Sequence, residues 1–422
     1  MVTSDTQALQ DGLARYARRL HAVVGEKHHV VSPLGAWLLL ALAGPAASGA
    51  SREALTDVLG CDVDMAARLA AGLLDRPHPL VASAAAVWTA PGAPLGPPFY
   101  DWRAGLPGLV ETGEMPDQAG VDAWAREHTF GLIEKFPLRL DPADYLVLAT
   151  ALAAKVSWDT PFDLAPAAEL GSGSAWAGEL GQVLRTPHGH GHAQFIATTP
   201  EAGDVVAHLA LARDGLLVAS VAAADGVAYG DVLAAAQRIA CAYAVTDPGL
   251  SGRGEIAAVV PRRALTSLPL GEAPLWRVRE ETSPDGAEDM CTAVLPAWSA
   301  RSQIGLGDSG LGFGAAARAL AGSDPWRAAQ SAMARYTRIG FEAGAVTAMA
   351  VFLSARPSQR HRVADLRFAH PYAVVAVALD PAFSDRSRGR RPAGPQSPWH
   401  GVPVFSAWVA RPDEATDDEP TR

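Results

Sequence analysis

The chain has 422 residues, 49% of them hydrophobic, and a formal net charge of −10. This length supports two or three ordinary domains, but no linker divides it, so one large domain is equally compatible. The acidic balance excludes a typical nucleic-acid-binding surface, which is basic, so we expect no nucleic-acid partner. The three scattered cysteines form no Cys-x-x-Cys pair, and they indicate neither a disulfide framework nor a zinc site.

The two ends of the chain are polar. The first residues have no basic start followed by an apolar stretch, so we expect no secretory signal peptide in the chain as written,. The apolar run 36–43 is too short to cross a bilayer. We therefore expect no membrane partner and a cytoplasmic location for the chain as written, with an extracellular location as the alternative. Residues 413–422 are rich in Asp and Glu and are predicted to be a disordered acidic tail,.

The first third of the chain is predicted to be mostly helical. Apolar residues recur at three- and four-residue spacing from 5 to 24, which is typical of an amphipathic helix,. Ser32 and Pro33 form a good helix start, because Ser accepts from exposed amides and Pro needs no donor. The helix after them is apolar all round and should be buried. Ser51 is expected to cap the next helix, which should end at Gly60.

The rest of the chain mixes strands and helices without strict alternation, which indicates an α+β fold. The expected elements are central strands at 81–88 and 145–157, a helix at 119–136, a hairpin at 203–223 that turns at Asp214-Gly215, a buried strand at 372–379 and a loop insertion at 381–401,.

Two short motifs could carry chemistry, but both favour ordinary loops. Residues 305–310 match Gly-x-Gly-x-x-Gly and include a Gly-Asp-Ser-Gly run, yet neither a βαβ unit nor a supporting His and Asp accompanies them,. His188, His190 and His192 alternate with glycines, so the segment is expected to be an exposed loop rather than a metal site,. We expect no cofactor, no metal and no catalytic residue.

The stretch 341–357 is the most informative part of the sequence. From Gly344 to Ser354 it contains no charge and no proline, which suits a strand that is buried on both faces,. In such a strand one face would carry Ala345, Thr347, Met349, Val351 and Leu353, and the other Val346, Ala348, Ala350 and Phe352,. The chain then becomes basic and loop-like from 356 to 362.

The Glu342-x-Gly344-x-x-x-Ala348-x-Ala350 run resembles the hinge of the reactive loop in serpins, the loop-inserting protease inhibitors. Further segments are similar to the family in the same order: 29–34 and 48–55, 121–125 and 129–133, 148–151 and 158–162, 295–298, 368–372, and 403–409. The resemblance covers roughly residues 5–412, with 164–260 much more diverged, and the chain looks like a diverged, prokaryotic-type member.

The resemblance implies one serpin-like domain at 1–412, with a large central mixed β-sheet, smaller sheets, eight or nine helices and an exposed reactive loop at 342–367. It implies an inhibitor rather than an enzyme. A serine protease would cut the loop and form an acyl-enzyme, and the cut loop would insert into the central sheet as a new strand. We expect a monomer that inhibits a trypsin-like protease; the alternative is a non-inhibitory binding protein with the same fold.

The resemblance also implies which residues act. The hinge comprises Glu342, Gly344, Ala345, Thr347, Ala348 and Ala350. Counting back from the closing strands places the reactive bond at Arg360–His361, while counting forward from the hinge gives Ser358–Gln359. We prefer Arg360 because Arg is a strong protease recognition residue in a basic context.

The region where the sheet would open is expected to contain Trp158, Ser32, Thr150 and Ala334. The family's polar cluster beneath this region has a Ser, an Asn and a His where this chain has Gly35, Thr150 and Ala334. This substitution either repacks the cluster or marks a sheet that no longer opens usefully.

Overall fold

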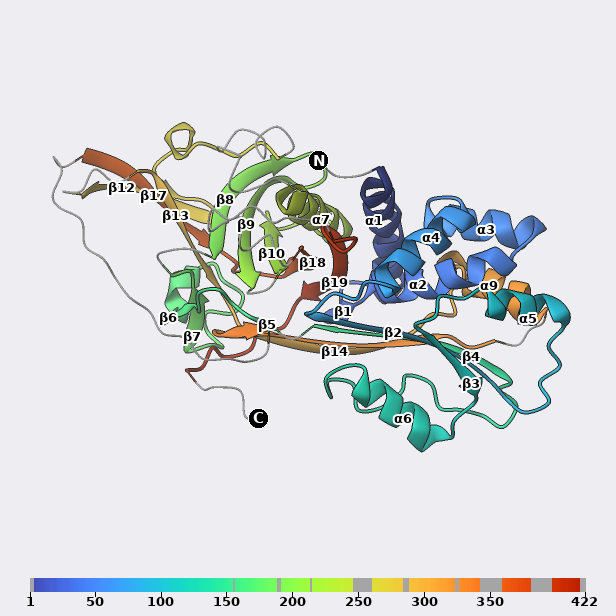
Figure 1. Ribbon diagram of the computed structural model, residues 1–422. Helices are drawn as coiled ribbons and strands as arrows, with labels where there is room; N and C mark the ends of the chain where they lie inside the picture. Colours follow the sequence, from blue (N-terminus) through green and yellow to red (C-terminus); the bar gives the residue numbers. More distant parts are fainter. Residues whose placement is uncertain are drawn as a thin grey trace.

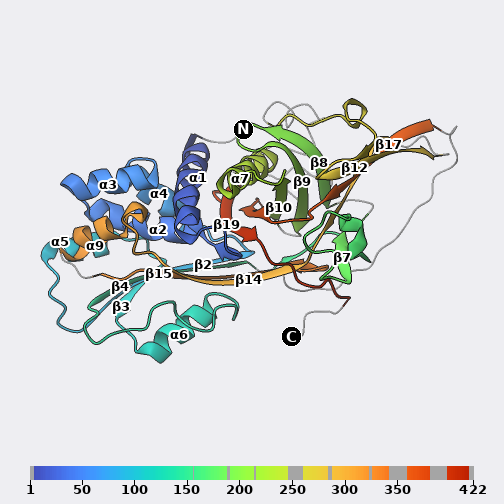
Figure 2. The same cartoon turned by 180° about the vertical axis from the view of Figure 1, so that it is seen from behind.

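A computed structural model describes residues 4–154, 156–187, 191–212, 215–245, 260–283, 288–322, 326–341, 359–380 and 397–417. A helical layer covers one face of the central β-layer, and α6 covers the opposite face (Figures 1 and 2). The helices are α1 Ser4–Val24, α2 Pro33–Ala43, α3 Gly49–Leu59, α4 Val63–Leu74, α5 Pro97–Ala104, α6 Gln118–Glu127, α7 Tyr229–Val245 and α9 Phe313–Ala321; the 3-10 turns are Gly44–Ala46, Ala167–Leu170, Leu265–Ser267 and Ser309–Leu311.

The central layer is divided into three groups of strands. One is the sheet β3–β2–β4, the second is the pair β14–β15, and the third is the short pair β5–β16. Their bounds are β2 Val81–Thr89, β3 Val110–Glu114, β4 Leu146–Ala154, β5 Val156–Ser157, β14 Trp298–Gly305, β15 Ala329–Tyr336 and β16 Gly340–Phe341.

Two six-stranded sheets form the other end of the molecule. The first is antiparallel, with the order β1–β19–β18–β10–β9–β8, and α7 packs on it. The second has the order β11–β12–β17–β13–β7–β6, and only β13 and β17 run parallel. The bounds are β1 His29–Val31, β6 Asp163–Pro166, β7 Gln182–Arg185, β8 His192–Thr199, β9 Gly203–Ala212, β10 Leu216–Ala223, β11 Gly271–Glu272, β12 Trp276–Ser283, β13 Met290–Leu295, β17 Gln359–Arg367, β18 Tyr372–Ala378 and β19 Val402–Val409.

Local sequence explains most of these elements. The apolar stripe of α1 is buried, including Leu13 and Leu20. At the start of α2, the Ser32 hydroxyl accepts from the Gly35 amide at 3.2 Å, as predicted,. The β9–β10 hairpin and the buried strand β18 are also where the pattern placed them. The predicted α+β class is confirmed, with eight α-helices in the residues described.

Two helix boundaries were predicted wrongly. α3 begins at Gly49 after Ser48, so Ser51 lies inside its first turn rather than at the cap; its end at Gly60 is correct, with φ of 75°. α6 ends at Glu127 and does not reach 136. The chain leaves the helix because Phe130 and Gly131 both adopt positive φ, 53° and 78°, a conformation that an α-helix cannot contain,.

Candidate functional site: a gap in the central sheet

A gap separates β4 from β15 in the middle of the central layer. β4 pairs with β2 on its far side, and β15 pairs with β14 on its far side. No ladder joins β4 to β15 in the part of the chain that the structure describes. Among the described residues, each strand therefore has one edge of backbone amides and carbonyls without a neighbouring strand, and such an edge is a template for an added strand,.

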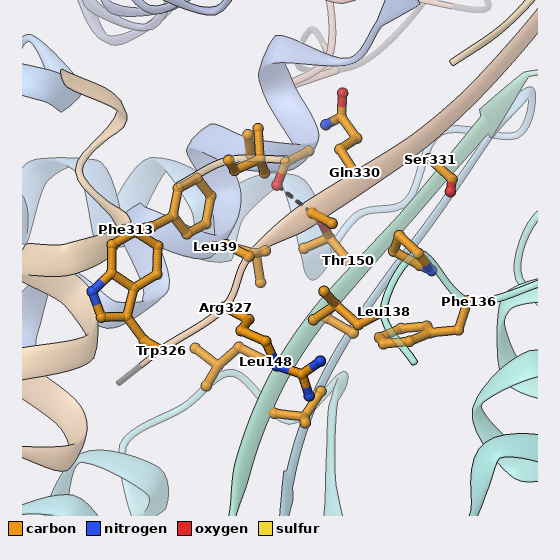
Figure 3. A pocket seen from close by; sticks show the side chains of 18 of the residues that line it. Leu39, Phe136, Leu138, Leu148, Thr150, Phe313, Trp326, Arg327, Gln330 and Ser331 are labelled. Carbon is orange, nitrogen blue, oxygen red and sulfur yellow. Dashed lines mark hydrogen bonds between the residues drawn. The ribbon is translucent and has the colours of Figure 1, made fainter. Parts of the chain in front are cut away.

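A cavity of about 210 Å³ lies between the two edges. Its walls come from β4, β15, α2, α9 and the segment after α6 (Figure 3). Apolar groups such as Leu39, Leu148 and Phe313 line most of it, and Thr150 and Gln330 supply polar groups. A strand that filled this gap would meet apolar surface on both faces, because α6 and α2 lie on opposite sides of the sheet.

One end of the gap, which we call its top, is closed by backbone pairing between β5 and β16. Gly340 and Phe341 of β16 pair with Ser157 and Val156 of β5. Next to them, the Trp158 amide donates to the Ile339 carbonyl at 3.1 Å, and the Phe162 amide donates to the Arg338 carbonyl at 2.9 Å. We call these two segments, 156–162 and 337–341, the clasp.

Trp158 lies at the centre of the clasp. Its side chain is completely buried, and its indole N–H donates to the Thr337 carbonyl at 2.9 Å. Its ring centroid is 4.9 Å from that of Tyr336 and 6.2 Å from that of Phe162. The indole thus joins the β5 side to the β15 side by both packing and a hydrogen bond, and a role in opening the sheet stays a prediction.

Below the clasp, the predicted polar positions are only partly brought together. The Ser32 hydroxyl donates to the Val404 carbonyl at 2.8 Å, and the Thr150 hydroxyl donates to the Gly35 carbonyl at 2.9 Å. Both contacts involve the first turn of α2. Ala334 is buried in the apolar core and contributes no polar group.

Gln330 supplies a polar connection that the sequence reasoning missed. Its side-chain carbonyl accepts from the Ser32 amide at 2.9 Å, and its amide group donates to the Ser32 carbonyl at 2.8 Å. Gln330 and Ala334 are four residues apart on β15, and alternation along a strand directs both to the same face. The sequence signal for this contact was a single carboxamide side chain, Gln330, an even number of residues from Ala334 in a predicted strand.

Gly340 is a second position that was missed. A Cβ built on it would lie 2.9 Å from the Ser157 Cα and still closer to the Val156 carbonyl oxygen, inside the 3.0 Å limit that real Cβ atoms observe. Its φ is not in the left-handed region. Glycine is therefore required for the close approach of the two backbones rather than for its own conformation.

The predicted reactive loop lies in sequence between this site and β17. The predicted hinge residues Glu342, Gly344, Ala345, Thr347, Ala348 and Ala350, together with Ser358, lie outside the described residues. The predicted hinge follows Phe341, the last residue of the clasp, directly in the sequence. The chain is described again from Gln359, the first residue of β17.

The preferred reactive bond lies inside β17. Arg360 pairs with Thr282 and His361 with Glu281, both on β12. Arg360 is exposed, whereas His361 is only 7% exposed. β13 joins the other edge of β17 only from Val363 onward. A protease that binds Arg360–His361 as an isolated extended segment must therefore displace the end of β12.

Two histidines pack behind the clasp. The rings of His192 and His208 are stacked with centroids 5.2 Å apart, and Phe162 contacts both. Burial lowers the pKa of both histidines, most strongly for His208, so both are neutral near pH 7,. His188 and His190 lie outside the described residues. The residues that are described include no group of three His, Cys, Asp or Glu side chains that could hold a metal.

The remaining motifs take structural positions. Residues 305–310 run from the end of β14 into the 3-10 turn Ser309–Leu311, and β14 pairs antiparallel with β15, which is not the context of a dinucleotide site,. Among the described residues, no helix is both long enough and apolar enough to cross a membrane.

The end of the chain is docked in part. The acidic tail was expected to be disordered from residue 413, but residues 413–417 contact β7, β14 and the clasp. Residues 418–422 lie outside the described residues.

Comparisons with known proteins support the fold. The family model "Serpin (serine protease inhibitor)" matches residues 10–169. A comparison with curated proteins finds no match. Among solved structures, human thyroxine-binding globulin complexed with thyroxine is similar at 13% identity and a TM-score of 0.61, covering 97% of this chain and 100% of that chain.

Two further similar structures are described as serpins in native states. The thermophilic serpin tengpin has 12% identity and a TM-score of 0.61, over 97% of this chain and 95% of its own. Arabidopsis AtSerpin1, in a native stressed conformation, has 14% identity and a TM-score of 0.57, over 98% of this chain and 100% of its own. The resemblance to the serpin family is thus confirmed: the chain has the serpin fold, and residues 10–169 carry the family's sequence pattern.

Proposed function

We propose that this protein inhibits a serine protease of the trypsin-like class by a loop-insertion mechanism. The protease cuts the loop near Arg360 and forms an acyl-enzyme with it. The loop upstream of the cut then enters the gap between β4 and β15 and carries the acylated protease away. Loop insertion by serpins is itself a well-known example of strand addition.

The observation that carries this proposal is that β4 and β15 face each other across the gap with edges that pair with no other described strand. β4 and β15 together offer hydrogen-bonding partners on both sides of an inserted strand. Each new ladder bond contributes about 0.5–1.5 kcal/mol net, while ordering each residue costs about 1–2 kcal/mol of backbone entropy. These contributions nearly offset each other, so the burial of apolar side chains decides the balance.

The sequence of the loop suits that requirement. Residues 345–353 are uncharged on both faces, and Val346, Val351 and Leu353 add roughly 1.5–3 kcal/mol each when fully buried,. The hinge begins directly after Phe341, so its first residue would enter at the clasp. We therefore propose Glu342, Gly344, Ala345, Thr347, Ala348 and Ala350 as the hinge, and a monomer as the acting form.

Incubation with trypsin at near-equal molar ratio, read on a denaturing gel, tests the proposal. The expected result is a covalent band near the summed mass and a released fragment that starts at His361. Arg360→Ala should abolish the band, whereas Arg76→Ala, an exposed arginine far along the chain, should not. A fragment starting at Gln359 would move the bond to the alternative position. Cleavage only outside 356–363 would refute the trypsin-like assignment.

The second candidate is a non-inhibitory binding protein. Thyroxine-binding globulin is one of the similar structures, and the gap of this protein holds an apolar cavity of about 210 Å³. Clean cleavage without an adduct, and without a gain in thermal stability of the cut form, would favour this function. A gain in stability without an adduct would mean that the loop inserts but that trypsin is not trapped.

A further inference from the structure

The C-terminal segment 413–417 bridges the two sides of the clasp. On the β14 side, the Asp413 amide donates to the Ala297 carbonyl at 2.7 Å, and the Ser299 hydroxyl donates to the Asp413 carboxylate at 2.6 Å. Ser299 belongs to β14, which pairs with β15, and β15 leads into the 337–341 side of the clasp.

The next two residues bind the other side. The Glu414 carboxylate accepts from the Gly181 amide at 2.9 Å and from the Gln182 amide at 2.6 Å. Ala415 is buried, and its amide donates to the Gln182 carbonyl at 3.3 Å. Gln182 starts β7, which pairs with β6, and β6 begins directly after Phe162 of the clasp.

The segment then returns to the clasp itself. The Arg338 guanidinium donates to the Asp417 carboxylate at 2.7 Å and to the Phe162 carbonyl at 3.3 Å. Phe162 and Arg338 are also joined by a backbone hydrogen bond, in which the Phe162 amide donates to the Arg338 carbonyl. In Figure 1 the last part of the chain runs past β7 and the adjacent end of β14. The tail thus crosses from one side of the clasp to the other, in parallel with the clasp's own hydrogen bonds.

We propose that residues 413–417 form a strap that holds the clasp closed and so limits how often the top of the gap opens. Separation of 337–341 from 156–162 moves Arg338 away from Phe162 and from β6 and β7 behind it, so it strains the path from Arg338 through Asp417 to Glu414 and Gln182. The Asp413 end of the strap stays near β7, because Leu295 of β13 pairs with Leu184 of β7. Apart from the contact of buried Ala415, the contacts are exposed, so each is weak, and their effect comes from acting together with the clasp,. The consequence for loop insertion rests on the proposed function, whereas the effect on the clasp does not.

Hydrogen exchange of the full-length, uncleaved protein tests the strap. The Trp158 and Phe162 amides report clasp opening directly, because they are bound to Ile339 and Arg338. Ending the chain after Pro412 should speed their exchange roughly three- to tenfold, the range expected for a few exposed charge-assisted contacts. Removing only residues 418–422 should leave the rate unchanged. Glu414→Ala should give a smaller increase, and Glu414→Gln, which keeps one acceptor, a smaller one still.

Unchanged exchange at Trp158 and Phe162 in the shortened protein would overturn the proposal. An equal acceleration in the β9–β10 hairpin would also overturn it, since the tail would then stabilise the whole fold rather than the clasp. The trypsin assay separates this inference from the proposed function. Faster clasp exchange without a covalent adduct supports the strap and counts against the inhibitor, whereas an adduct with unchanged exchange removes the strap alone.

Discussion

Replacement of Gly340 by alanine should weaken the clasp and thereby lower the stability of the uncleaved protein. The added methyl would lie 2.9 Å from the Ser157 Cα and closer still to the Val156 carbonyl oxygen, both backbone atoms that cannot rotate away. The two strands must therefore separate by several tenths of an ångström. The matched control is Gly305→Ala at the end of β14, where a Cβ meets no atom within 4 Å.

The size of the effect follows from the bonds that the separation strains. Trp158, Phe162 and Thr337 donate backbone bonds across or within the clasp. Loss of two or three such bonds, at about 0.5–1.5 kcal/mol each, predicts a decrease of roughly 1–4 kcal/mol in the free energy of unfolding. Overpacking of a tight site costs about 1–3 kcal/mol in general, which is consistent with this range.

Urea-induced unfolding, followed by tryptophan fluorescence before and after loop cleavage, measures this effect in both forms. In the uncleaved protein, Gly340→Ala should lower the midpoint and Gly305→Ala should not. If a strand inserts after cleavage, it separates β16 from β5, and the penalty disappears in the cleaved form. An equal loss in both forms would show that β5 and β16 stay paired, and an unchanged uncleaved midpoint would refute the clash itself.

Two other outcomes are expected. Gln330→Ala removes both partners of the Ser32 backbone and should lower the stability of the uncleaved protein by roughly 1–3 kcal/mol, with Ser331→Ala as the control in chemical denaturation,. Buried His208 has a lowered pKa in the folded state, so the unfolded chain binds the extra proton. Stability should be full above about pH 6.5 and fall as the pH drops below it, by up to about 1.4 kcal/mol per pH unit per histidine, and His208→Asn should reduce that slope in unfolding curves recorded from pH 7 to pH 4.

The sequence by itself determined the local structure, which depends on residues close together in the chain. The apolar period of α1, the Ser32 cap of α2 and the β9–β10 hairpin are local patterns, and local chemistry produces them wherever they occur,. The ordered landmarks also indicated the serpin fold. The length of α6 was overestimated, because apolar residues continue past Glu127 while the backbone turns out of the helix at Phe130 and Gly131, and the Gly131 amide closes that turn on the Arg126 carbonyl.

The tertiary structure decided which residues meet across the gap. Whether β4 and β15 pair or separate depends on how two halves of a sheet pack on α2, and neither strand's own sequence contains that information. In the sequence Gln330 is an ordinary strand residue, and its role comes from the hydrogen bond with the backbone of Ser32, 298 positions earlier. Glycine is required at 340 only because the backbone of Val156 approaches it. The acidic tail has the composition of a solvated segment, but Glu414 accepts hydrogen bonds from the Gly181 and Gln182 amides in the folded protein. In each case the decisive contact joins distant segments, so it becomes visible only once the chain has folded.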